Sequence, residues 1–263
     1  MSPKIQIEDL KKQFGGQWVT DGLSLSIEAG KMTIILGKSG EGKSVLLKQI
    51  IGLIKPTSGA IIIDGVNIAR ATEQELSAMF QQFGYVFQSA ALLDSLNVFE
   101  NIGITLLEVG KSVATVLPIV KEALDLVHLE EDTLYKYPSQ LSGGMKKRVG
   151  LARTLVTKPT IILYDEPTTG LDPITARVIH ELMYSMQKTF NLTSVVISHD
   201  LDILKFADEV ALLHNGKIRY NGPAKTAWES DNPYIYQFLR GLSEGPIQAD
   251  PVDKHKKTYT FNG

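Results

Sequence analysis

The chain has 263 residues with 27 basic and 29 acidic side chains, and its formal net charge of −2 provides no general positive field to hold a polyanion. We therefore expect no nucleic-acid partner, and the hydrophobic fraction of 43% excludes a disordered, collagen-like or coiled-coil chain. Cysteine is absent, which excludes disulfides, cysteine-zinc sites and a cysteine nucleophile.

The first part of the chain predicts antiparallel strands followed by a buried strand and a helix. Alternating runs between Ile5 and Ile27 are interrupted by Gly15-Gly16 and by Asp21-Gly22, which predicts strands joined by turns. The apolar run Met32–Leu36 predicts a central strand buried on both faces. A glycine-rich loop separates this strand from Val45–Leu53, where apolar residues recur at helical spacing.

Strands and helices alternate through the rest of the chain. Helices are predicted within about 98–137, over 144–156 and from Pro173 onward. The remaining strands are predicted at short apolar runs, namely Ile61–Val66, Tyr85–Phe87, Ile161–Tyr164, Ser194–Ile197, Val210–Leu213 and Lys217–Tyr220. The predicted fold class is therefore α/β: a mainly parallel sheet, an N-terminal antiparallel β subdomain, and an inserted helical subdomain at about residues 89–157.

Two further stretches have a distinctive composition: residues 76–93 lack charge, and residues 242–263 have few apolar side chains. The uncharged run 76–93 contains three glutamines, so we expect no membrane span there. Residues 242–263 contain two prolines and a basic cluster, which predicts a tail after a domain at 1–241. Tyr259 and Phe261 alternate with polar residues, which leaves open an added strand or anchor on a neighbouring subunit as the alternative to disorder.

The glycine-rich loop matches the phosphate-binding pattern and lies, as that function requires, between a buried strand and a helix. It consists of Gly37, Lys38, Ser39, Gly40, Glu41, Gly42, Lys43 and Ser44, and Val45 follows it in the helix. Backbone N–H groups and the helix N-terminus would hold a β-phosphate, Lys43 would reach the β- and γ-phosphates, and the Ser44 hydroxyl would ligate Mg²⁺. The alternative, an ordinary glycine-rich turn, is disfavoured by the full match.

The run Ile161–Tyr164 ends in two adjacent carboxylates, Asp165 and Glu166. Neighbouring side chains on a strand point in opposite directions, so these two carboxylates should diverge. Asp165 is then a candidate Mg²⁺ ligand, and Glu166 is a candidate to polarise a water aimed at the γ-phosphate. Without the phosphate loop, a common surface turn before Pro167 would be the simpler interpretation.

A second anion-binding segment is predicted at the start of the helix near residue 144. It comprises Ser142, Gly143, Gly144 and Met145. Such a helix N-terminus exposes backbone N–H groups that favour an anion. Because the chain already has a complete phosphate loop, the nucleotide of a partner subunit explains this segment.

These motifs together resemble those of the ATP-binding cassette ATPases. The resemblance extends from about Ile5 to Gly241 and rests on ordered segments, namely Gly37–Ser44, Gln88, Leu141–Met145, Ile161–Glu166, Gly170-Leu171-Asp172 and His199. The resemblance implies a phosphate-loop core that hydrolyses ATP with Mg²⁺. It also implies a head-to-tail homodimer, in which Ser142 and Gly144 contact the γ-phosphate held by the other subunit.

The same resemblance implies roles for four further residues. Phe14 would stack on adenine, and Gln88 would contact Mg²⁺ or the attacking water. Asp172 would link the two sites, and His199 would hold the γ-phosphate. One departure is Met145, which stands where the family usually has glutamine. The remaining histidines, at positions 128, 180, 214 and 255, match nothing and are expected to be surface or packing residues.

A narrower resemblance is to the cytoplasmic ATPases of Mla-type phospholipid transporters. Its segments are Phe87–Leu92, Asn97–Asn101, Leu141–Met145 and Asp231–Gly241. This resemblance implies a peripheral protein on the cytoplasmic side of the bacterial inner membrane, working with a permease that docks near residues 88–102. It also implies a mammalian-cell-entry-domain protein and a STAS-domain protein as partners, and a role in outer-membrane lipid asymmetry.

Other functions remain open at this stage. They are a soluble cassette ATPase for cofactor assembly, an importer or exporter of another substrate, and a regulatory module that binds ATP without hydrolysing it. Glu166 is present, which argues against the last of these.

Overall fold

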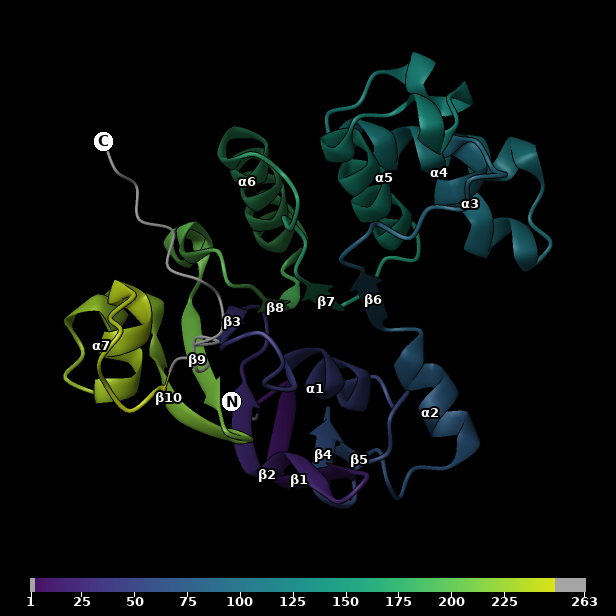
Figure 1. The fold of residues 1–263 in the computed structure, drawn as a ribbon. Helices are drawn as coiled ribbons and strands as arrows, with labels where there is room; N and C mark the ends of the chain where they lie inside the picture. The colour runs from purple at the N-terminus through teal and green to yellow at the C-terminus, as the bar shows by residue number, and fades with distance from the viewer. Residues whose placement is uncertain (1–2, 249–263) are drawn as a thin grey trace, which may run out of the picture.

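The computed structural model describes residues 3–248, and its centre is a six-stranded sheet with the order β10-β9-β3-β8-β7-β6 (Figure 1). Its strands are β3 (Met32–Leu36), β6 (Phe83–Val86), β7 (Ile161–Asp165), β8 (Thr193–Ile197), β9 (Glu209–His214) and β10 (Lys217–Pro223). All neighbouring pairs are parallel except β9 and β10, which form an antiparallel hairpin. The predicted mainly parallel sheet is confirmed, and the carboxyl ends of its parallel strands lie at one edge.

A separate four-stranded antiparallel sheet has the order β2-β1-β4-β5. It consists of β1 (Ile5–Phe14), β2 (Gln17–Ile27), β4 (Ser58–Ile63) and β5 (Val66–Asn67). Gly15 and Gly16 form the turn between β1 and β2, as predicted. The turn predicted at Asp21-Gly22 is wrong: both residues lie inside β2, where Asp21 pairs with Lys11 beside a register shift that absorbs the irregularity.

Seven α-helices lie among the described residues: α1 (Lys43–Ile50), α2 (Glu73–Phe80), α3 (Val98–Glu108), α4 (Val113–Leu126), α5 (Gly143–Leu155), α6 (Pro173–Phe190) and α7 (Pro233–Arg240). Short 3-10 helices occur at η1 (Glu131–Tyr135), η2 (Pro138–Gln140), η3 (Leu201–Phe206) and η4 (Ala224–Glu229). Helices α3, α4 and α5 follow β6 and precede β7, and they form the lobe set beside the sheet in Figure 1. No helix within 3–248 is long and apolar enough to span a membrane.

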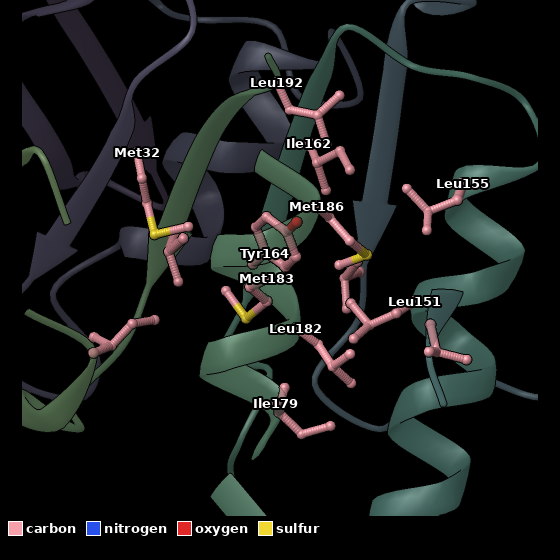
Figure 2. Packing of buried hydrophobic residues seen from close by; sticks show 14 of the residues in the cluster. Met32, Leu151, Leu155, Ile162, Tyr164, Ile179, Leu182, Met183, Met186 and Leu192 are labelled. Atoms are coloured by element: carbon pink, nitrogen blue, oxygen red, sulfur yellow. The ribbon is translucent and has the colours of Figure 1, made fainter. Parts of the chain in front are cut away.

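The central sheet separates two hydrophobic cores. On one face, Ile34 of β3 belongs to a cluster that includes α6 and the helical lobe. On the other face, Ile35 belongs to a cluster with α1 and the antiparallel sheet. This alternation follows from the period of two along a strand. Figure 2 shows the first cluster where Tyr164 of β7 packs against Met183 of α6.

The chain continues beyond α7 and returns to it. Ile247 is 8% exposed, and its backbone N–H donates to Gln237 Oε1 at 2.7 Å. Gln237 Nε2 donates in turn to the carbonyl oxygens of Ile247, at 2.8 Å, and Leu242, at 3.1 Å. The expected tail at 242–263 therefore begins with a packed segment. Residues 249–263, which include Tyr259 and Phe261, lie outside the described part of the chain.

Candidate functional site

The phosphate loop connects β3 to α1 and is enclosed by neighbouring strands. A Cβ atom on Gly37 would lie 2.6 Å from the Leu213 carbonyl oxygen, so a larger residue would displace the loop from β9. Gly42 has a φ of +87° and begins α1, with its carbonyl accepting from Leu46. These glycines let the backbone wrap closely over the sheet edge and lead directly into the start of α1.

Lys43 is held inside the loop that it belongs to. Its side chain is buried, and Nζ donates to the carbonyl oxygens of Gly37 and Lys38, each at 2.7 Å. Burial lowers the pKa of Lys43, while the negative charges of Glu166, Glu41 and Asp165 act in the opposite direction. The lysine thus places a positive charge at the centre of the loop.

Asp165, the last residue of β7, faces the phosphate loop. Its Oδ1 accepts from the Ser44 hydroxyl at 2.8 Å, and its Oδ2 accepts from the Tyr85 hydroxyl at 3.0 Å. Burial, followed by the Asp165 charge, raises the pKa of Tyr85. The sequence analysis missed Tyr85 as a site residue; its place near the end of β6, the strand beside β7, was the available signal.

Glu166 faces a different set of partners, as the alternation predicted. Its Oε2 accepts from Thr169 Oγ1 at 2.9 Å and from Gln88 Nε2 at 3.3 Å. Its Oε1 lies 3.5 Å from Nδ1 of His199, whose side chain is largely exposed after β8. Glu166 also has a φ of +49°, a left-handed conformation that is strained for a residue with a Cβ atom. A strained carboxylate with converging polar neighbours is typical of a reactive site.

The turn that carries Gln88 is fixed by a lysine from the helical lobe. Lys147 of α5 is buried, and its Nζ donates to the Gln88 carbonyl oxygen. Burial lowers the pKa of Lys147, and the nearby Glu166 charge opposes this shift. The sequence analysis missed Lys147 as a site residue. The contact connects the first turns of α5 with the Glu166 region.

Glu41 is the one acidic residue of the loop 37–44, and its side chain points to the β9–β10 hairpin. His214 Nδ1 lies 2.7 Å from Oε1, and the Asn215 backbone N–H donates to Oε2, also at 2.7 Å. The sequence analysis left His214 as a surface or packing residue. The Asn215-Gly216 turn was a visible hairpin signal, but nothing local linked it to residue 41.

The segment Ser142–Met145 begins α5 in the helical lobe. Ser142 is the N-cap of α5, and its Oγ accepts from the Met145 N–H at 3.2 Å. A Cβ atom on Gly144 would lie 2.6 Å from Cγ2 of Thr175, at the start of α6. Among the described residues, no hydrogen bond joins this segment to the phosphate loop of the same chain. The phosphate loop lies beside Asp165 and Glu166, and Glu166 in turn contacts Gln88 and His199. The segment Ser142–Met145 does not belong to this group of contacts.

Two more predicted residues lie at the periphery. Phe14 ends β1 with 46% of its surface exposed, and the Lys12 ammonium lies 4.7 Å from its ring centroid. Asp172 caps α6 by accepting from the backbone N–H groups of Ile174 and Thr175 and from the Thr175 hydroxyl. These hydrogen bonds lower the pKa of Asp172.

The donor set at β7 suits a divalent cation of the magnesium type. The Ser44 hydroxyl and the Asp165 carboxylate oxygens are hard ligands that already contact each other. Within residues 3–248 no cluster of three or more acidic or histidine side chains could enclose a metal by itself. The arrangement fits an ion that keeps waters and shares phosphate oxygens with a nucleotide, as Mg²⁺ does.

Comparison with known proteins supports this chemistry. Residues 20–169 match the ABC transporter family. The probable ribonucleotide transport ATP-binding protein mkl of Mycobacterium tuberculosis is 39% identical over 94% of this chain and 69% of its own length. The intermembrane phospholipid transport system ATP-binding protein MlaF of Haemophilus influenzae is 36% identical over 93% of both chains. The dimeric post-hydrolysis structure of the ATP-binding cassette MJ0796, bound to ADP and Pi, aligns with a TM-score of 0.75 and 30% identity over 84% of this chain and 98% of that one.

Proposed function

This chain belongs to the ABC transporter family and is an ATP-hydrolysing cassette, and from that premise we propose that it drives a membrane permease that moves phospholipid. The observation that carries the hydrolytic part is the grouping of Lys43, Asp165 and Glu166 around one loop. The phospholipid part is supported by the similarity to MlaF, which extends over 93% of both chains.

In the proposed reaction, the loop N–H groups and the Lys43 ammonium bind the β- and γ-phosphates. Glu166 accepts a hydrogen bond from the attacking water and takes its proton. Thr169 and Gln88 hold that carboxylate in place, and His199 lies beside it to contact the γ-phosphate. Preorganised donors and acceptors of this kind act without rearrangement at the moment of reaction.

We further propose that Ser44, Asp165 and Gln88 hold Mg²⁺ together with the nucleotide. When bound, the ion neutralises negative charge on the phosphate oxygens. Tyr85 keeps Asp165 oriented by donating to the oxygen that does not contact Ser44. Partners of this outer kind fix the geometry of a ligating carboxylate.

A second copy of the chain completes the proposed site. The segment Ser142–Met145 lies apart from the phosphate loop of its own chain, and the Met145 N–H is already bonded to Ser142 Oγ, so we assign the N–H groups of Gly143 and Gly144 to a nucleotide on another subunit. We assign to Asp172, which accepts from the Thr175 hydroxyl next to Gly144, the role of linking the two sites. Phe14, exposed at the end of β1, is the proposed support for adenine.

The permease is proposed to dock where the helical lobe meets β6. A groove of about 980 Å³ lies there, and its lining includes Phe87, Ala91, Ile104 and Arg153. Phe87 is 44% exposed and Leu93 is 46% exposed, as suits side chains that a partner covers. The proposed setting is the cytoplasmic face of the bacterial inner membrane, with a mammalian-cell-entry-domain protein and a STAS-domain protein, and the proposed role is outer-membrane lipid asymmetry.

Affinity purification from mildly solubilised membranes of the native host, followed by mass spectrometry, tests this function. We expect a permease and a mammalian-cell-entry-domain protein to co-purify. A permease with a different substrate-binding protein would replace phospholipid with another cargo, such as the ribonucleotide named for mkl. A set of soluble partners alone would remove the transport proposal and leave the ATPase chemistry.

A further inference from the structure

An acidic residue inside an anion-binding loop poses an electrostatic problem. The loop 37–44 presents N–H groups, Lys43 and a helix N-terminus, all of which favour phosphate. Glu41 adds a negative charge to this loop, and like charges at close range oppose binding. The position of the Glu41 carboxylate therefore affects how well the loop holds a polyphosphate.

The structure pairs both oxygens of that carboxylate with groups of the β9–β10 hairpin. His214 Nδ1 contacts Oε1 and the Asn215 backbone N–H contacts Oε2, each at 2.7 Å. The side chains of Glu41 and His214 are 12% and 9% exposed, so little water competes for these contacts. An ionised carboxylate only accepts, so His214 carries its proton on Nδ1.

The β9–β10 hairpin is held in place by its own turn geometry and by a hydrogen bond to β2. Asn215 and Gly216 form a two-residue turn with φ values of +50° and +70°, the conformation that Asn-Gly turns favour. On the far side, the Gly216 carbonyl accepts from the Asp21 N–H of β2 at 3.0 Å. The turn N–H that reaches Glu41 is thus fixed by the strands around it.

The imidazole of His214 is held from the C-terminal helix. Its ring centroid lies 5.9 Å from that of Tyr234 in α7, and the Arg219 guanidinium lies 5.3 Å from the Tyr234 ring centroid. Arg219 Nε also donates to the His214 carbonyl oxygen at 3.3 Å. These contacts keep the ring aimed at Glu41.

We propose that His214 and the Asn215 N–H are positioning groups that keep the Glu41 carboxylate turned away from the phosphate-binding side of the loop. The affinity for ATP then depends on this clamp, although neither residue touches the nucleotide. This inference rests on the proposed placement of ATP at the loop 37–44.

The test measures equilibrium binding of MgATP to the full chain by displacement of a fluorescent nucleotide. We expect His214→Ala to weaken binding about tenfold, within the range of coupled neighbouring groups. The double variant His214→Ala with Glu41→Ala should bind within about twofold of Glu41→Ala alone, because no carboxylate remains to be misplaced. His214→Asn, whose amide can donate from the Nδ1 position, should bind like the wild type.

The salt dependence gives a readout that packing loss does not share. Because charge repulsion is screened, the ratio of dissociation constants between His214→Ala and the wild type should shrink at high salt. The proposal would be overturned if the double variant bound MgATP as weakly as His214→Ala does. It would also be overturned if the ratio of the two dissociation constants did not change with salt. If His214→Ala does not fold, the comparison uses the wild type, His214→Asn and Glu41→Ala. A His214→Asn variant that binds MgATP about tenfold more weakly than the wild type would then overturn the proposal. A wild type that does not bind MgATP would instead overturn the proposed function itself.

Discussion

Asp165 and Glu166 are adjacent in sequence but bind different neighbours. Asp165 contacts the Ser44 and Tyr85 hydroxyls, whereas Glu166 contacts Thr169, Gln88 and His199. The end of β7 thus separates the carboxylate that we propose binds the cation from the one that we propose acts as the base. At the residue scale, the proposed chemistry depends on this divergence.

Replacing Glu166 with glutamine tests the assignment of the base. We expect Glu166→Gln to lower ATP turnover at least about a hundredfold, because an amide cannot accept the proton of the attacking water. Nucleotide binding should persist, since the side chain keeps its size and one acceptor oxygen, and ATP should accumulate in a closed dimer. Steady-state phosphate release and size-exclusion chromatography measure both effects.

The matched control is Glu181→Gln, which alters an exposed glutamate on α6 that pairs with Arg177. Its turnover should equal that of the wild type. A fully active Glu166→Gln variant would contradict the assignment.

At the scale of elements, the contact between the starts of α5 and α6 leaves room for no side chain at one of two neighbouring glycines. A Cβ atom would lie 2.6 Å from Thr175 Cγ2 at Gly144, but 3.5 Å from the nearest side-chain atom at Gly143. We expect Gly144→Ala to be less stable than Gly143→Ala by about 1–3 kcal/mol, the usual cost of overpacking. Denaturant unfolding of the two variants measures this difference, and equal midpoints would show that the helices adjust freely.

Helix α6 also buries a titratable side chain. His180 is 1% exposed, and its Nε2 lies 3.8 Å from Asp200 Oδ2. Burial lowers the pKa of His180 below 6.5; the Asp200 and Asp202 charges oppose this shift, and the Arg177 charge adds to it. The unfolded chain therefore binds the proton more readily, so folding free energy is lost as the pH falls through about 6.5.

The variant His180→Leu isolates this contribution. Between about pH 7.5 and pH 5.5, the wild type should lose more unfolding free energy than His180→Leu, because the variant has no titratable side chain at position 180. Urea unfolding at several pH values gives both curves. Parallel curves would mean that His180 does not titrate on unfolding.

The elements that the sequence predicts have a buried face, although α7, which buries Ile235 and Leu239, was also missed. Met32–Leu36 and Ile161–Tyr164 are strands, and the helix before residue 156 is α5. Helix α2 was missed because Met79 is its only buried residue, so no apolar stripe marks it. Its signal was the capping box of Thr72 and Glu75.

The candidate site residues also fall into two groups, those that belong to a local motif and those that reach the site only through folding. Those in local motifs, such as Lys43 and Glu166, could be predicted from order and spacing. Tyr85 and His214 could not, because their roles arise from contacts made by folding, and His214 is 173 positions from Glu41. Strand order, which sets such contacts, is not a property of any local segment.

At the scale of the whole molecule, two truncations distinguish the packed segment 242–248 from the residues after it. A chain ending at Gln248 keeps the packed segment and serves as the reference. A chain ending at Gly241 should lose about 2–4 kcal/mol of unfolding free energy, since it exposes the apolar surface under Ile247 and removes the hydrogen-bond partners of Gln237. Denaturant unfolding tests this pair, and equal stabilities would show that Ile247 does not hold the segment.

Deletion of residues 242–263 should also weaken assembly of the proposed transporter. Co-purification with the permease checks this separate prediction.

Strand β3 occupies the middle of the central sheet, with β8 on one side, β9 on the other and all five residues buried. Its amide protons should therefore exchange with deuterium only when the whole domain opens, whereas those of α2 should exchange through local opening. The phosphate loop begins at the residue after β3, so its first residue is tethered to the slowest-exchanging part of the chain. Each cycle of nucleotide arrival and departure would then leave this anchor unmoved, and the reversible motion would be confined to the lobes around it.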